Sequence, residues 1–219
     1  MRGDPFYSNG SVGACDGNAC DYPANFTLSG WVAAQWNPHV RERYQALLSA
    51  LANHPEVGSK IYGMNFPETA ISVDESSNDF NNVTYFDGTL ANAAFARSVF
   101  PPDVFVVQYV NFWPDAYADP LVLNASFAAL QKTGVGVGGP DDIPGRKALE
   151  ANVYPFMREY KGKLAIETIA VQEPDLAATN TTTGMPFTRE GYTTFAEALG
   201  AEIIFWATSA PWLQGSDPW

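Results

Sequence analysis

Two glutamates follow apolar segments of this chain at positions where they could do acid–base chemistry. Glu68 comes directly after Pro67 in the stretch GSKIYGMNFPETA, residues 58–70, and Glu173 follows Gln172. Because proline has no backbone N–H to donate, we expect the first apolar segment to stop at Pro67 and to leave Glu68 in a loop. A carboxylate there could act as a general acid or base, or it could only cap the next turn. The rest of the chain must therefore supply a partner for it.

Polar and aromatic side chains gather where the apolar segments end. Carboxylates could do the acid–base work, amides could bind hydroxyl groups, and flat aromatic rings suit the apolar faces of pyranose rings. The combination therefore favours a sugar ligand. The residues at these ends are Asn65, Glu68, Gln108, Asn111, Trp113, Asp141, Gln172, Glu173 and Trp206.

The elements that must position these residues form a repeating pattern. Apolar runs occupy residues 60–65, 104–112, 134–138, 164–172 and 202–207, and helical stretches between them occupy residues 89–100, 121–132, 146–160 and 189–199. The runs are continuous, which is typical of parallel strands buried on both faces. Their spacing fits βα units. The sequence therefore predicts an α/β fold with a parallel sheet, whose carboxyl strand ends meet at one edge.

We interpret residues 1–219 as a single domain without a linker. Residues 1–36 read as a long loop segment rich in Gly, Asn, Ser and Asp. Residues 37–219 read as one helix followed by five βα units. The helix begins with Asn37 as a cap and Pro38 at its first position.

On these residues the chain resembles the (β/α)8-barrel glycoside hydrolases of the retaining, clan A type. The ends at Glu68 and Glu173 look like those of the fourth and seventh strands in that group, and Trp206 in IIFWATSAPW is similar to the tryptophan of the last strand. The chain is also similar to uncharacterised bacterial barrel proteins with Gly-Gly-Pro-Asp after the sixth strand. The resemblance implies strands four to eight of a barrel, hence an incomplete one.

The resemblance also implies roles for the residues. Glu68 would protonate the leaving oxygen, Glu173 would attack the anomeric carbon, and Glu68 would then activate water. Asp141 is a credible substitute for Glu173 in the same ring of strand ends. The amides Asn65, Gln108, Asn111 and Gln172 would bind hydroxyl groups, and Trp36, Trp113 and Trp206 would stack on sugar rings.

Two other readings remain open. A non-catalytic carbohydrate-binding relative, or an inactive fragment, would keep the aromatic and amide residues but lack a working carboxylate pair. A complete five-stranded, doubly wound domain would cover both faces of its sheet and hold Glu68 and Glu173 too far apart to cooperate. A barrel fragment would expose sheet edges, so we expect a second chain or a missing segment to complete it.

The composition of the chain limits the classes of ligand and partner that it could bind. The formal net charge is −12, from 24 acidic and 12 basic residues, which disfavours nucleic acid and anionic membrane surfaces. We expect a poly- or oligosaccharide ligand, no cofactor and no metal. The first residues lack the apolar core of a signal peptide, so an extracellular or periplasmic location is favoured only if an export signal lies outside these residues. Cys15 and Cys20 could form a local disulfide or stay as two thiols.

Overall fold

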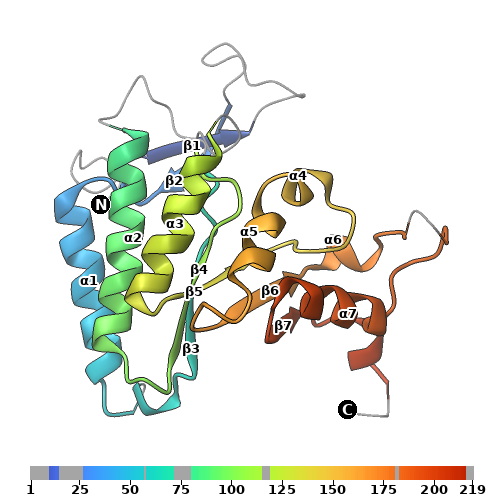
Figure 1. The fold of residues 1–219 in the computed structure, drawn as a ribbon. Coiled ribbons are helices and arrows are strands. Elements are labelled where there is room, and N and C mark those ends of the chain that lie inside the picture. The colour runs from blue at the N-terminus through green and yellow to red at the C-terminus, as the bar shows by residue number, and fades with distance from the viewer. Residues whose placement is uncertain are drawn as a thin grey trace.

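The computed structural model describes residues 10–14, 27–56, 58–71, 80–114, 119–180 and 183–215. Its centre is a five-stranded sheet in which neighbouring strands follow the order of the chain and all run parallel. The strands are β3 (Gly63–Phe66), β4 (Phe105–Tyr109), β5 (Gly136–Gly139), β6 (Glu167–Val171) and β7 (Ile203–Trp206). The sheet curls into a half-barrel with helices between its strands (Figure 1).

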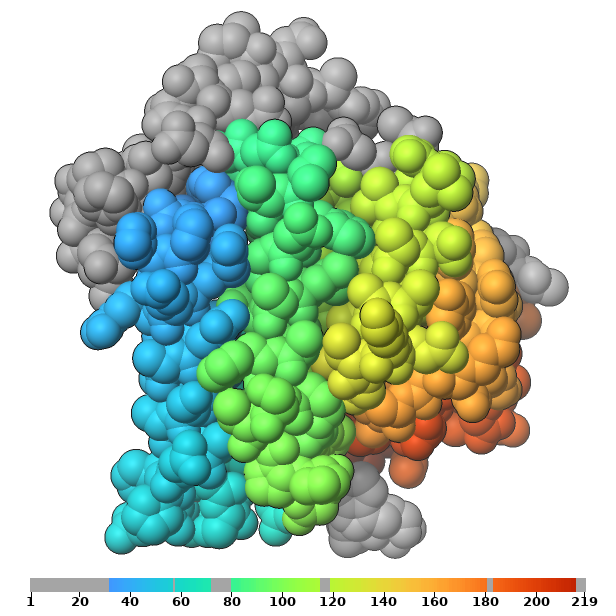
Figure 2. Space-filling view, turned by 60° about the vertical axis from the view of Figure 1, so that its left-hand side comes forward, coloured from blue at the N-terminus to red at the C-terminus, as the bar shows by residue number. Residues whose placement is uncertain are grey.

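Helices alternate with the strands along the chain, and the longer ones lie side by side outside the sheet. They are α1 (Pro38–Asn53), α2 (Asn82–Val99), α3 (Pro120–Thr133), α4 (Lys147–Glu150), α5 (Val153–Tyr160), α6 (Glu173–Leu176) and α7 (Arg189–Leu199), with 3-10 turns η1 (Gly58–Lys60) and η3 (Pro211–Leu213). Figure 2 shows α1, α2 and α3 as adjacent ridges on one surface. Within the ranges given above, every helix is too short or too polar to span a lipid bilayer.

Side-chain caps set where the long helices begin. Asn37 accepts a hydrogen bond from the backbone N–H of His39, as expected for the cap of α1. Asn81 accepts bonds from the first turn of α2, so this helix begins seven residues before the start at residue 89 predicted from the sequence. Asp119 caps α3, which ends at Gly134 in the left-handed conformation (φ 73°).

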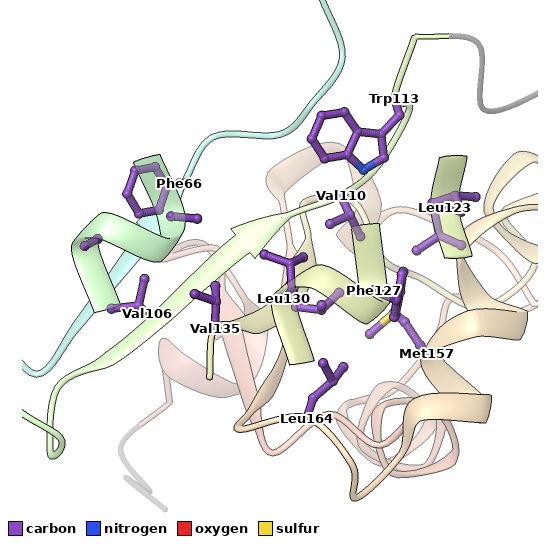
Figure 3. Packing of buried hydrophobic residues seen from close by; sticks show 14 of the residues in the cluster. Phe66, Val106, Val110, Trp113, Leu123, Phe127, Leu130, Val135, Met157 and Leu164 are labelled. Atoms are coloured by element: carbon purple, nitrogen blue, oxygen red, sulfur yellow. The ribbon is translucent and has the colours of Figure 1, made fainter. Parts of the chain in front are cut away.

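The main core lies between the sheet and the helices. Val106, Val137 and Ile169 project from β4, β5 and β6 into this layer, where they are almost completely buried. Figure 3 shows how residues of α3 and α5 meet the strands there. The labelled members of the cluster are Phe66, Val106, Val110, Trp113, Leu123, Phe127, Leu130, Val135, Met157 and Leu164.

The inner face of the curled sheet is built differently. The amide of Asn65 on β3 donates to the hydroxyl of Tyr109 on β4 at 3.1 Å. Gly138 pairs with Tyr109 and with Thr168, and a Cβ on this glycine would lie only 2.3 Å from the Thr168 hydroxyl. The missing side chain therefore lets three strands approach closely on the inner side of the curve.

These observations correct two expectations. The sequential strand order has no reversal and the helices lie on one side of the sheet, so the doubly wound alternative is wrong. Residues 1–36 are not all loop, because β1 (Gly10–Ala14) and β2 (Thr27–Val32) form an antiparallel pair. The central strands are buried on both faces, as expected, because Val106 on the helix side and Val107 on the inner face are each at most 1% exposed. The possible disulfide of Cys15 and Cys20 lies outside the described residues.

The parallel sheet has two open edges. Among the described residues β3 pairs only with β4, and β7 pairs only with β6. Five consecutive strands with this curl are consistent with an incomplete TIM-like barrel.

Candidate active site

A group of carboxylates surrounds one arginine at the carboxyl ends of the strands. Arg146 lies between β5 and α4, and its Nη2 is 3.1 Å from Oδ2 of Asp141 and 3.4 Å from Oδ1 of Asp175. Glu68, which follows β3, and Asp142 also act electrostatically on this group. One guanidinium thus contacts two carboxyl groups and acts electrostatically on two more, and repulsion among four carboxylates would make their full ionisation unfavourable.

Glu68 has the environment of a proton donor. Its side chain is half-buried, and burial is the main cause that raises the pKa of its carboxyl. Repulsion from Asp141 raises the pKa further, whereas Arg146 lowers it. A carboxyl group whose pKa is shifted upward in this way keeps a proton available closer to neutral pH.

The backbone is strained where two neighbouring strands end. Asp141 after β5 has φ 57° and Phe112 after β4 has φ 62°, and they are the two described non-glycine residues with positive φ. Such conformations cost about 1–3 kcal/mol each and cluster at functional sites. The strained backbone is therefore a second indication that a functional site lies at this edge of the sheet.

Asp142 is completely buried beside Asp141. The Asn111 amide donates to Pro140 O at 2.7 Å and to Asp142 Oδ1 at 3.3 Å. Burial raises the pKa of Asp142 well above its ordinary value, the hydrogen bond from Asn111 lowers it, and Asp141 raises it again. These influences together favour the protonated form.

Asp175 is held in place by its own helix. Its Oδ2 accepts a hydrogen bond from the backbone N–H of Gln172 at 3.2 Å, which closes the first turn of α6. Tyr192 on α7 donates its hydroxyl proton to the backbone O of Asp175 at 2.5 Å. Burial is the main cause that raises the pKa of Asp175. These hydrogen bonds therefore hold Asp175 in a fixed position beside Arg146.

The structure separates the four amides expected to bind hydroxyl groups. Gln108 is buried, and its Nε2 donates to Pro67 O at 2.8 Å and to Tyr109 O at 2.9 Å. Asn111 is buried as described above. The structure does not support a direct hydroxyl-binding role for these two, because both are buried and their amides bind backbone carbonyls at the strand ends. Asn65 and Gln172 are exposed at the edge and remain candidates.

The tryptophans expected to stack on sugar rings belong largely to the core. Trp113 is 2% exposed and packs against Phe86 with ring centroids 4.8 Å apart, and Trp36 is 6% exposed and meets Phe80 edge to face. So little of either ring is exposed that the structure does not support the stacking role for these two. Trp206 is only partly buried, and it packs edge to face on Trp212 at 4.9 Å.

Glu173 makes a different contact from the carboxylates that bind Arg146. It is exposed at the first position of α6, where its Oε1 accepts a 3.4 Å hydrogen bond from Ser209. The charges that act on the pKa of Glu68 are those of Asp141 and Arg146. Asp141 is thus the predicted site residue that the structure couples electrostatically to Glu68.

Three members of the group were not identified from the sequence. Asp142 and Arg146 stand in GGPDDIPGR, where the second aspartate and an arginine four residues later were the available signal. Asp175 stands in QEPD, two residues after Glu173, at a position whose helix-capping role was not recognised.

A separate groove of about 300 Å³ lies between the first turns of α2 and α3. Val83, Phe86, Leu121 and Val122 give it apolar walls, with Trp113 on one side. It lies in the helix layer and contains none of the carboxylates around Arg146, so it is distinct from the candidate site.

Within the described ranges, no three or more His, Cys, Asp or Glu side chains are grouped so that they could hold a metal ion. No protein-family model matches this chain, and a search of curated proteins finds no significant match.

Proposed function

We propose that the chain is part of a carbohydrate-active hydrolase that cleaves O-glycosidic bonds with Glu68 as the general acid. The observation that carries the proposal is the environment of Glu68, a half-buried carboxyl whose pKa is raised beside Asp141, which Arg146 holds by an ion pair. Glycoside hydrolysis requires a protonated carboxyl group with a second carboxylate across the scissile bond.

In the first step, Glu68 gives its proton to the glycosidic oxygen while the bond from that oxygen to the anomeric carbon breaks. A second carboxylate attacks the anomeric carbon and forms an ester bond. In the second step, Glu68 takes a proton from water, the water oxygen bonds to the anomeric carbon, and the ester bond breaks. Both groups return to their starting states.

We take Asp141 as the second carboxylate, in place of the Glu173 predicted from the sequence. Arg146 forms a 3.1 Å ion pair with Asp141, and the charge of Asp141 acts on Glu68. Retention of configuration requires about 5–5.5 Å between the two carboxyl groups, whereas about 6.5–9.5 Å leads to inversion. The stereochemistry of the product therefore tests the pairing.

The experiment compares Glu68→Gln, Asp141→Asn and Glu173→Gln on a panel of aryl glycosides with good and poor leaving groups. Loss of the acid should lower kcat on poor leaving groups by about 10²–10⁴, with a much smaller effect on activated ones. Asp141→Asn should lower kcat on both kinds of substrate, and Glu173→Gln on neither. Equal effects of Glu68→Gln on all leaving groups would contradict the acid role.

Completion of the barrel belongs to the same proposal. The open edges of β3 and β7 would pair with strands from a second chain or a further segment, and these would also close the far side of the sugar site. If the chain binds oligosaccharides by calorimetry but turns over none in the completed assembly, the non-catalytic alternative is the correct one.

A further inference from the structure

Two buried oxygens beneath the candidate site face each other without a donor. Oδ1 of Asn111 and Oδ2 of Asp142 are both inaccessible, and neither has a hydrogen-bond partner within the described residues. Both lie against Gly139: a Cβ on this glycine would be 2.4 Å from the first oxygen and 2.5 Å from the second. Two buried acceptors next to each other without a proton between them would be costly.

The orientation of the Asn111 amide is fixed independently. Its Nδ2 lies 2.7 Å from the backbone O of Pro140, which can only accept a hydrogen bond. Turning the amide over would place its oxygen against that carbonyl. Asn111 Oδ1 therefore stays on the side of Gly139 and Asp142, and a donor for it must come from there.

We propose that Asp142 is a protonated positioning residue that shares two hydrogen bonds with Asn111. Nδ2 of Asn111 donates to Oδ1 of Asp142, as observed at 3.3 Å, and the proton on Oδ2 of Asp142 is donated to Oδ1 of Asn111. One proton thereby satisfies both unpartnered oxygens. The pair ties the end of β4 to the end of β5.

The charges around Asp142 agree with the protonated form. Asp141 and Asp175 are negative neighbours, while Arg146 forms its ion pairs with these two. Tyr109 and Tyr154 are the other titratable groups that interact with Asp142, and Tyr154 is engaged with the backbone N–H and O of Ile143 at 3.0 Å each. Burial and the negative neighbours raise the pKa of Asp142.

The pair has a direct consequence for the candidate site. Asp142 directly follows Asp141, whose backbone is in the left-handed region. Holding Asp142 in place therefore also fixes the direction of the Asp141 side chain. This consequence rests on the proposed function, since it concerns the carboxylate that acts on Glu68. The acid–amide pair itself does not depend on any activity.

The test compares Asp142→Asn with Asp142→Ala in the full chain. An asparagine reproduces the protonated acid, because its amide can donate to Asn111 Oδ1 and its oxygen can accept from Asn111 Nδ2. At pH 7, we expect the Tm of Asp142→Asn to equal or exceed that of the native chain. The Tm of Asp142→Ala should be lower by roughly 4–8 °C or more. If Asp142 is instead an ionised group, both variants lose stability alike.

Infrared spectroscopy supplies a readout that does not require catalysis. The native-minus-Asp142→Asn difference spectrum at pH 7 should contain the C=O band of a protonated carboxyl group, whereas a carboxylate band in its place overturns the proposal. If the enzyme is active, Asp142→Asn should also retain the native pH profile while Asp142→Ala shifts it. A failed hydrolase assay together with a protonated carboxyl band would refute the proposed function and leave this pair standing.

Discussion

Glu167 offers the sharpest test of the electrostatics of this fold, far from the candidate site. It is the first residue of β6, at the amino end of the strand. Its side chain is buried, and neither carboxyl oxygen has a hydrogen-bond partner among the described residues. One of them packs on Gly200, where a Cβ would lie 2.9 Å away. Burial first, and then repulsion from Glu202, raise the pKa of Glu167 to about 8, against the opposing effect of Lys161.

The sign and size of the effect follow from this shift. Because the pKa in the folded state is higher than in the unfolded chain, the stability contributed by Glu167 is complete below pH 4.5 and is lost as pH rises to about 8. Between pH 5 and pH 9 a shift of this size corresponds to at most about 4 kcal/mol. Relaxation and water penetration around a buried charge reduce it, so we expect about 2–4 kcal/mol.

The perturbation is Glu167→Gln, and the assay is urea unfolding at pH 5 and at pH 9. If the amide of the buried glutamine finds no partner, its cost to stability is the same at both pH values. The difference in unfolding free energy between the native chain and the variant therefore changes with pH only through the charge of Glu167. Relative to the native chain, the variant should gain about 2–4 kcal/mol between the two pH values. The exposed Glu159→Gln is the matched control and should show no such gain. An equal difference at both pH values would refute the assignment of a buried, unpartnered carboxyl.

Three further predictions test packing and capping by thermal or urea unfolding. Gly139→Ala should destabilise the chain by about 1–3 kcal/mol, because the new methyl group meets Asn111 and Asp142 at 2.4 and 2.5 Å; an unchanged Tm would mean that the two side chains can move apart. Asn81→Ala should cost about 1 kcal/mol through loss of the cap of α2, and Asn81→Asp should restore it. Tyr192→Phe should cost about 1 kcal/mol through loss of the hydroxyl bond to the Asp175 backbone, and a neutral result would argue against that buried bond.

The order and type of the main elements could be predicted from the sequence, whereas their limits could not. All five parallel strands coincide with the predicted apolar runs, although β3 and β5 each extend one residue beyond theirs, because runs of this kind between helical stretches are the pattern of βα units. The start of α2 was missed because residues 82–88, NVTYFDG, combine Gly with other weak helix formers. There the Asn81 cap and burial of Tyr85 and Gly88 decide the outcome. The pair β1–β2 was missed because Gly- and Ser-rich strands carry little alternation.

The edge of the sheet that carries the carboxylates was also predicted, but the roles of individual residues depend on contacts between distant parts of the chain. Asp141 was recognised as a strand-end carboxylate, and its ion pair with Arg146 was not. Asp175 comes to the same guanidinium from the end of another strand. Spacing along the chain cannot show that a single arginine joins them.

Strand alternation explains why two amides could not fulfil the role expected of them. In β4, successive side chains point to opposite faces of the sheet, and Val106 points to the helices. Gln108 therefore points the same way, into the buried layer, whereas Tyr109 points to the inner face where Asn65 meets it. An amide on the helix side must satisfy backbone carbonyls, and Gln108 does so at Pro67 and its own strand end. A ligand inside the half-barrel would meet the alternate residues, so the polar groups available to it are those in register with Asn65 and Tyr109, together with the carboxylates that extend beyond the strand ends.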